Sequence, residues 1–268
     1  MKQIFFFVLF ILLVSPIALA HEEGEEEEIS IDDKLRQASV FYLYLASTII
    51  ALFVIVAVYA EKRAHFTDRK KMILFLGIIV PAALVTVYLV GATIYLNSIS
   101  QTEGPVHWHA DYEIYACGNK IEMKEPTGMS NKVGSEAFHH HGDNRIHVEG
   151  VLVDEADADL HNFFEVTEGE LTHTSISIPT KEYVATFKNG DSCNGYQGVL
   201  QVFVYKIIDG KAVQEKLTNF EDYVLSPYAN VPPGDCIVVE FDTEKEKTNR
   251  MCETYRIAIK KGALSYGG

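Results

Sequence analysis

Two long apolar segments constrain this chain more than any other feature. Residues 38–60 and 72–96 contain no charged side chain, and each exceeds the roughly 20 residues that a helix needs to cross the hydrocarbon core of a bilayer. Tyrosines lie towards the ends of both segments, where an amphipathic ring suits the membrane interface. The sequence therefore predicts a transmembrane hairpin of two helices.

The loop between these segments, residues 61–71, predicts their orientation. Its basic residues are Lys62, Arg63, Arg69, Lys70 and Lys71. Because cytoplasmic loops are enriched in Lys and Arg, we expect the loop in the cytoplasm of a cell with the hairpin in its plasma (cytoplasmic) membrane. The N-terminal tail and residues 97–268 then lie outside the cytoplasm. Neither segment contains an acidic, basic or histidine side chain that would suggest an ion path, which favours an anchor over a transporter.

The first twenty residues resemble a secretory signal peptide. Lys2 precedes an apolar run that is too short to span a bilayer, and small residues follow at Ala18 and Ala20. We expect cleavage after Ala20; the alternative is an uncleaved membrane anchor. Residues 21–37 form an acidic tail whose carboxylates repel one another, which predicts disorder.

Residues 97–268 are numerous enough to form one domain with a substantial core. Turn signals at residues 118–119, 189–190 and 209–210 separate short apolar runs, and residues 199–208 are typical of a buried strand. A short helix is expected within residues 156–164, after acids that suit a helix N-terminus, and no other helix of any length. This pattern predicts a mainly β domain, either a sandwich or a barrel-like fold.

The four cysteines all lie in this outer part, as expected in an oxidising compartment. Residues 236–241 and 250–259 both look like strands, and folding them as a hairpin would place Cys236 near Cys252. We therefore predict the disulfide Cys236–Cys252, which leaves Cys117 to pair with Cys193.

Net charge limits the range of partners. The formal net charge is −14, whereas nucleic-acid binding requires clustered Lys and Arg. The sequence therefore predicts no nucleic-acid partner, and a cation is a better fit.

Six of the ten histidines lie within residues 107–147. Residues 106–116 alternate apolar and polar side chains, which predicts a half-buried strand with His107 and His109 on its polar face. The same spacing of two residues joins His139 to His141, and His147 to Glu149. His140 would point to the opposite face, and we predict that it does not belong to the group formed by the other histidines.

Gly142, Asp143 and Asn144 form a plausible turn between the later pairs. A hairpin centred near Asp143 would place His139 opposite His147, with all the pairs on one face. A shift of one residue in register would instead separate them.

Clustered imidazoles of this kind suit copper or zinc. The predicted metal ligands are His107, His109, His139, His141, His147 and Glu149. The alternative is a solvated strand face whose histidines bind no metal.

The motifs HWHADYEIYACG, HHHGDNRIHVEG, LHNFFEV and GDSCNG are similar to those of an uncharacterised family of secreted or membrane-anchored proteins, mostly archaeal and environmental bacterial. The resemblance covers about residues 104–241. It implies a β fold and a metal site, and it implies no particular activity. Five positions match the family's recurring histidines: His107, His109, His139, His141 and His147.

Three functional hypotheses follow. The first is a membrane-anchored, extracytoplasmic module that binds copper or zinc for sensing, storage or delivery to a membrane protein partner. The second is a metal-dependent enzyme, cupin-like or copper-based, in which Glu113 accepts a proton because it shares a strand face with His107 and His109. The third is a surface or assembly protein without metal. No nucleophile is evident, which favours the first hypothesis.

Overall fold

A computed structural model describes residues 31–61, 67–225 and 234–267 of the chain. The chain divides into two compact units, Met1–Ile99 and Ser100–Gly268. The predicted signal peptide, most of the acidic tail, and Lys62 and Arg63 of the basic loop lie outside the described residues.

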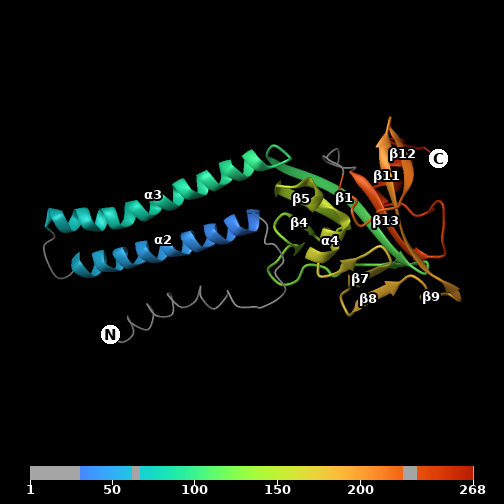
Figure 1. Cartoon of the computed structure of the whole chain (residues 1–268), viewed down its shortest axis with the longest axis horizontal. Coiled ribbons are helices and arrows are strands. Elements are labelled where there is room, and N and C mark those ends of the chain that lie inside the picture. Colours follow the sequence, from blue (N-terminus) through green and yellow to red (C-terminus); the bar gives the residue numbers. More distant parts are fainter. Residues whose placement is uncertain (1–30, 62–66, 226–233, 268) are drawn as a thin grey trace. The chain divides into compact units, whose positions relative to one another are not determined.

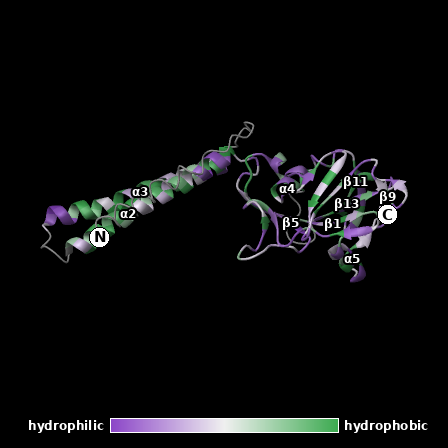
Figure 2. Cartoon of the chain, turned by 90° about the horizontal axis from the view of Figure 1, so that it is seen from below, coloured by the Kyte–Doolittle hydropathy of each residue, from purple (hydrophilic) through white to green (hydrophobic). Residues whose placement is uncertain are grey.

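The first unit contains two long helices, α2 (Ile31–Glu61) and α3 (Asp68–Ile99) (Figure 1). Both are long and apolar enough to cross a membrane, and apolar residues run along most of their length (Figure 2). The helices pack closely, with the rings of Tyr42 and Tyr88 in edge contact at 4.8 Å. A side chain in place of Gly77 would collide with the ring of Phe53. The predicted helical hairpin is confirmed.

Helix α2 begins earlier than expected. Residues 31–37 were assigned to the disordered tail but are helical. Asp32 and Asp33 lie in the first turn, where negative charge is stabilised by the positive end of the helix dipole. Those carboxylates therefore favour a helix start here.

The second unit is built around a large mixed sheet with the strand order β14-β12-β11-β13-β1-β5-β4-β3, and with β2 also paired to β1. Its strands are β1 (Pro105–Ala116), β2 (Asn119–Ile121), β3 (Val133–Gly134), β4 (Phe138–His140), β5 (Arg145–Val151), β11 (Val199–Ile208), β12 (Lys211–Leu217), β13 (Asp235–Asp242) and β14 (Ser265–Tyr266). Strand β1 is central, parallel to β13 and antiparallel to β5. The strands described form an open sheet and not a closed barrel.

The described part of this unit also contains two smaller sheets and three short helices. One sheet contains β6 (Glu170–Leu171), β7 (Ser175–Pro179) and β8 (Val184–Lys188); the other pairs β9 (Ser192–Cys193) with β10 (Tyr196–Gln197). The helices are the 3-10 turn η1 (Glu155–Ala158), α4 (Leu160–Val166) and α5 (Glu253–Lys260). The separate sheets fit the predicted sandwich-like, mainly β fold. The carboxylates of Asp154 and Asp159 cap η1 and α4, as expected for acids at helix N-termini.

Strand β1 separates two hydrophobic clusters. Its even-numbered side chains, such as Trp108 and Tyr112, belong to a cluster that includes Phe163 of α4. Tyr115 belongs to a second cluster with Tyr255 of α5. The prediction of a half-buried strand therefore holds only for the first part of β1. From Ala110 onwards every side chain in β1 is buried.

Helix α5 corrects the prediction for residues 250–259. They were expected to form a strand, but residues 253–260 are helical. Tyr255 and Ile259, four residues apart, lie on one side of this helix and pack into the second cluster. Both predicted disulfides are nevertheless present, Cys117–Cys193 and Cys236–Cys252. The second one joins β13 to the start of α5 instead of closing a hairpin.

Candidate metal centre

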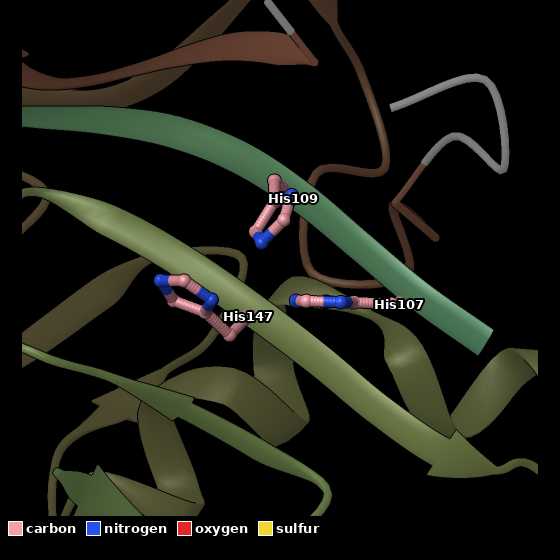
Figure 3. Close-up of side chains that lie close together, drawn as sticks. All are labelled: His107, His109 and His147. Carbon is pink, nitrogen blue, oxygen red and sulfur yellow. The ribbon is translucent and has the colours of Figure 1, made fainter. Parts of the chain in front are cut away.

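Strands β1 and β5 bring His107, His109 and His147 together. Their register places His109 directly opposite His147, and His107 opposite Glu149. The ring centroids of His107 and His109 are 4.5 Å apart, and those of His109 and His147 are 4.6 Å apart. Figure 3 shows the three rings turned toward one another between the two strands.

Strand β4 adds two more histidines. It pairs with β5 so that His139 lies opposite His147, which confirms the predicted hairpin around residues 142–144. The ring of His141, just after β4, lies 4.9 Å from that of His139 and 4.7 Å from that of His147. The five histidines predicted from the sequence therefore form one cluster, which we call the histidine cluster.

Two groups of three within the histidine cluster have ligand atoms close enough to hold a metal ion. One is His107, His109 and His147, and the other is His139, His141 and His147. Within each group the ligand atoms lie within 4.8 Å of one another. Zinc–nitrogen bonds are about 2.0–2.1 Å long, so two nitrogens on one ion are at most about 4 Å apart. Small ring rotations would bring the side chains to that distance.

Buried nitrogens in the cluster lack hydrogen-bond partners among the described residues. These atoms are Nδ1 of His109, Nδ1 of His139, and both ring nitrogens of His147. A buried polar atom without a partner costs about 1–3 kcal/mol, and such atoms are rare in native proteins. A metal ion bound between the rings would supply the missing partner.

The electrostatic environment keeps these rings neutral. Burial lowers the pKa values of His109 and His139, and neighbouring positive groups lower them further. Burial, together with His109, lowers the pKa of His147 to about 4. A neutral imidazole keeps a lone pair on one nitrogen, and metal ions require that form.

A hydrogen bond orients one of the rings, and a carboxylate lies beside another. Nδ1 of His141 lies 2.5 Å from the carbonyl oxygen of Asn131. Because that oxygen only accepts, Nδ1 of His141 carries the proton and Nε2 keeps the lone pair. Nε2 of His107 lies 3.1 Å from Oε1 of Glu149. Partners of this kind hold a metal-binding histidine in one orientation and tautomer.

Two carboxylates flank the histidine cluster. Glu149, predicted as a ligand, lies beside His107, and its Oε1 is also 4.0 Å from Nδ1 of His147. Asp143, which was predicted only as a turn residue, has Oδ2 3.8 Å from Nε2 of His147. The hairpin that pairs His139 with His147 also places Asp143 near the cluster. The turn predicted at residues 142–144 was therefore the sequence feature from which the position of Asp143 could have been inferred.

His140 points away from the cluster, as predicted. It is fully buried, in ring contact with Tyr112 and Phe163, and its Nδ1 accepts a hydrogen bond from the amide of Gly142. Burial lowers its pKa to about 4. His140 therefore belongs to the core.

Glu113 does not serve the cluster, which corrects the sequence-based expectation. It is buried and pairs with Arg256 of α5 at 3.2 Å, while accepting a hydrogen bond from the hydroxyl of Tyr115. The odd-numbered side chains of β1 belong to the histidine cluster only at the start of the strand, at His107 and His109. Further along the strand they lie under α5, so Glu113 is committed to an ion pair.

Comparisons with protein-family models, with curated proteins and with solved structures gave no match. The histidine cluster is therefore interpreted from its own geometry.

Proposed function

We propose that this chain is a membrane-anchored, extracytoplasmic module that binds copper or zinc through its histidine cluster, for sensing, storage or delivery of the metal to a membrane protein partner. One observation carries the proposal: His147 of β5 lies between His109 of β1 and His139 of β4, and all three have buried nitrogens without a hydrogen-bond partner among the described residues. Neutral imidazoles in this arrangement suit both metals.

The compartment is part of the proposal. Two disulfides support an oxidising environment for the second unit. Arg69, Lys70 and Lys71 lie in the first turn of α3, consistent with a cytoplasmic loop between the helices. With both helices in the membrane, the histidine cluster would then lie outside the cytoplasm, where it meets metal ions entering or leaving the cell.

The family resemblance agrees with this function. The five motif histidines that suggested the resemblance are the five that converge in the cluster. We propose that the family's recurring histidines serve as metal ligands. The enzyme hypothesis rested on Glu113, and the ion pair with Arg256 removes that support.

Elemental analysis tests the proposal. The full chain would be purified in detergent with a histidine-free tag, beside a variant with His107, His109, His139 and His141 changed to Ala. A control variant with His161 and His173 changed to Ala loses histidines that lie outside both metal-binding groups. We expect near-stoichiometric copper or zinc in the wild type and the control, and none in the cluster variant, with both disulfides intact in all three. An absence of metal from the wild type, even after reconstitution with either ion, would overturn the proposal.

A further inference from the structure

His147 connects two parts of the histidine cluster that do not otherwise touch. Its ring contacts those of His107 and His109 on one side, and those of His139 and His141 on the other. Among the described residues, no ring contact joins a member of the first pair to a member of the second. Both groups able to hold a metal ion include His147.

The two nitrogens of His147 have different surroundings. Nδ1 lies 4.0 Å from Glu149, whose carboxylate also contacts His107. Nε2 lies 3.8 Å from Asp143 in the turn after His141. Both nitrogens are buried, and neither has a hydrogen-bond partner in the described part of the chain. A neutral imidazole with one metal on one nitrogen would leave the other nitrogen buried and without a partner.

We propose that the centre binds two transition-metal ions, one on each ring nitrogen of His147. The first ion takes Nδ1 of His147 with His107 and His109, beside Glu149; the second takes Nε2 with His139 and His141, beside Asp143. This inference rests on the proposed function, because it assigns a second ion to the same cluster. Each ion would have three nitrogen ligands and room for a fourth ligand, as four-coordinate zinc and copper sites require.

Proton and charge balance are consistent with this arrangement. The neutral ring of His147 carries one proton, and the second ion displaces that proton to solvent, so the ring bridges the two ions as an imidazolate. Glu149 and Asp143 place one carboxylate near each ion. Together with the imidazolate they offset three of the four positive charges of two divalent ions.

Metal stoichiometry tests the inference. The full chain in detergent would be stripped with a chelator, titrated with Cu(II), and separated from unbound metal. We expect two equivalents in the wild type and in the His161→Ala, His173→Ala control. We expect one equivalent in His107→Ala, His109→Ala and one in His139→Ala, His141→Ala, because each variant loses one group and keeps the other.

Electron paramagnetic resonance of the same samples tests the bridge. Copper ions joined by an imidazolate couple antiferromagnetically, so the wild-type signal should integrate to well below two spins at low temperature, whereas each pair variant should give one full spin. Two equivalents with two uncoupled spins would overturn the bridge. A single equivalent in the wild type, lost in both pair variants, would overturn the second ion and leave the proposed function standing. No binding by the wild type would instead reject the proposed function itself.

Discussion

The rings of His139 and His147 are parallel, with an interplanar angle of 2° and centroids 5.5 Å apart. Strands β4 and β5 pair these two residues directly, so their side chains leave the sheet side by side. The same register that stacks the rings also brings His141 and Asp143 to the cluster. The group of His139, His141 and His147 therefore depends on this strand pairing.

Metal should contribute substantially to the stability of the second unit. A ligand that binds only the folded state stabilises it by about 2.7 kcal/mol at 100 times its dissociation constant. We expect a chelator to lower the thermal midpoint of the wild type, followed by the fluorescence of Trp108, the single tryptophan. The variant lacking His107, His109, His139 and His141 should show no response to the chelator, and an equal response in that variant would contradict the assignment.

His147→Leu should affect the stability of the metal-free protein and that of the metal-loaded protein in opposite directions. In the metal-free protein it removes two buried nitrogens without partners, which cost about 1–3 kcal/mol each. We expect the metal-free variant to be as stable as the wild type, or more stable. The metal-loaded form should lose its stabilisation, because both groups lose a ligand. Chemical denaturation with and without a chelator measures both effects; an equal loss in the two forms would show that His147 acts by packing alone.

Acid should destabilise the metal-free protein through its buried histidines. Burial lowers the pKa of His140 to about 4, against an ordinary value of 6.5. Between these two values the unfolded chain binds a proton that the folded chain does not. The stabilising contribution is therefore present above about pH 6.5 and is lost as the pH falls towards 4.

Thermal midpoints of chelated protein across this pH range measure the effect. His140→Leu should reduce the dependence on pH, since it removes one of these groups. His173→Ala serves as the control for the loss of a histidine, because His173 lies outside the core with an exposed side chain. If the thermal midpoint of His140→Leu changes with pH as much as that of the wild type, His140 does not contribute to the loss of stability in acid.

Glu113→Gln should separate stability from metal binding. The change weakens the ion pair between the buried carboxylate of Glu113 and the exposed Arg256, which helps to hold α5 against β1, and we expect a loss of about 1 kcal/mol in the free energy of unfolding. Because Glu113 does not reach the cluster, metal stoichiometry should not change. If the folded variant loses its metal, Glu113 takes part in metal binding and this prediction is wrong.

The disulfide Cys236–Cys252 should stabilise the position of α5. Its two cysteines are 16 residues apart in sequence, and a loop of that length predicts a contribution of about 3 kcal/mol. The double substitution to Ser should lower stability by about that amount under oxidising conditions. Metal content should be retained, because β1, β4 and β5 carry the cluster. Parallel denaturation and elemental analysis test both expectations.

Local patterns in the sequence were sufficient for much of this protein. The uncharged lengths of residues 38–60 and 72–96 predicted both long helices, since helix length must match the thickness of a bilayer. Strand alternation placed His107 and His109 on one face, because side chains repeat every two residues. The turn at residues 142–144 then made the pairing of His139 with His147 predictable. Each of these inferences depends only on residues close together in the chain.

Long-range pairing was decided only by the tertiary structure. The sequence determined that β1 and β5 each carry histidines, but not that His109 would lie opposite His147. That register follows from burying Trp108 and Val148 on the opposite face of the sheet, across a long connection. Residues 253–260 are a helix because α5 buries Tyr255 against Tyr115 of β1, and this packing commits Glu113 to an ion pair with Arg256 instead of the metal site. Local patterns determined which side chains share a face, whereas packing determined which faces meet.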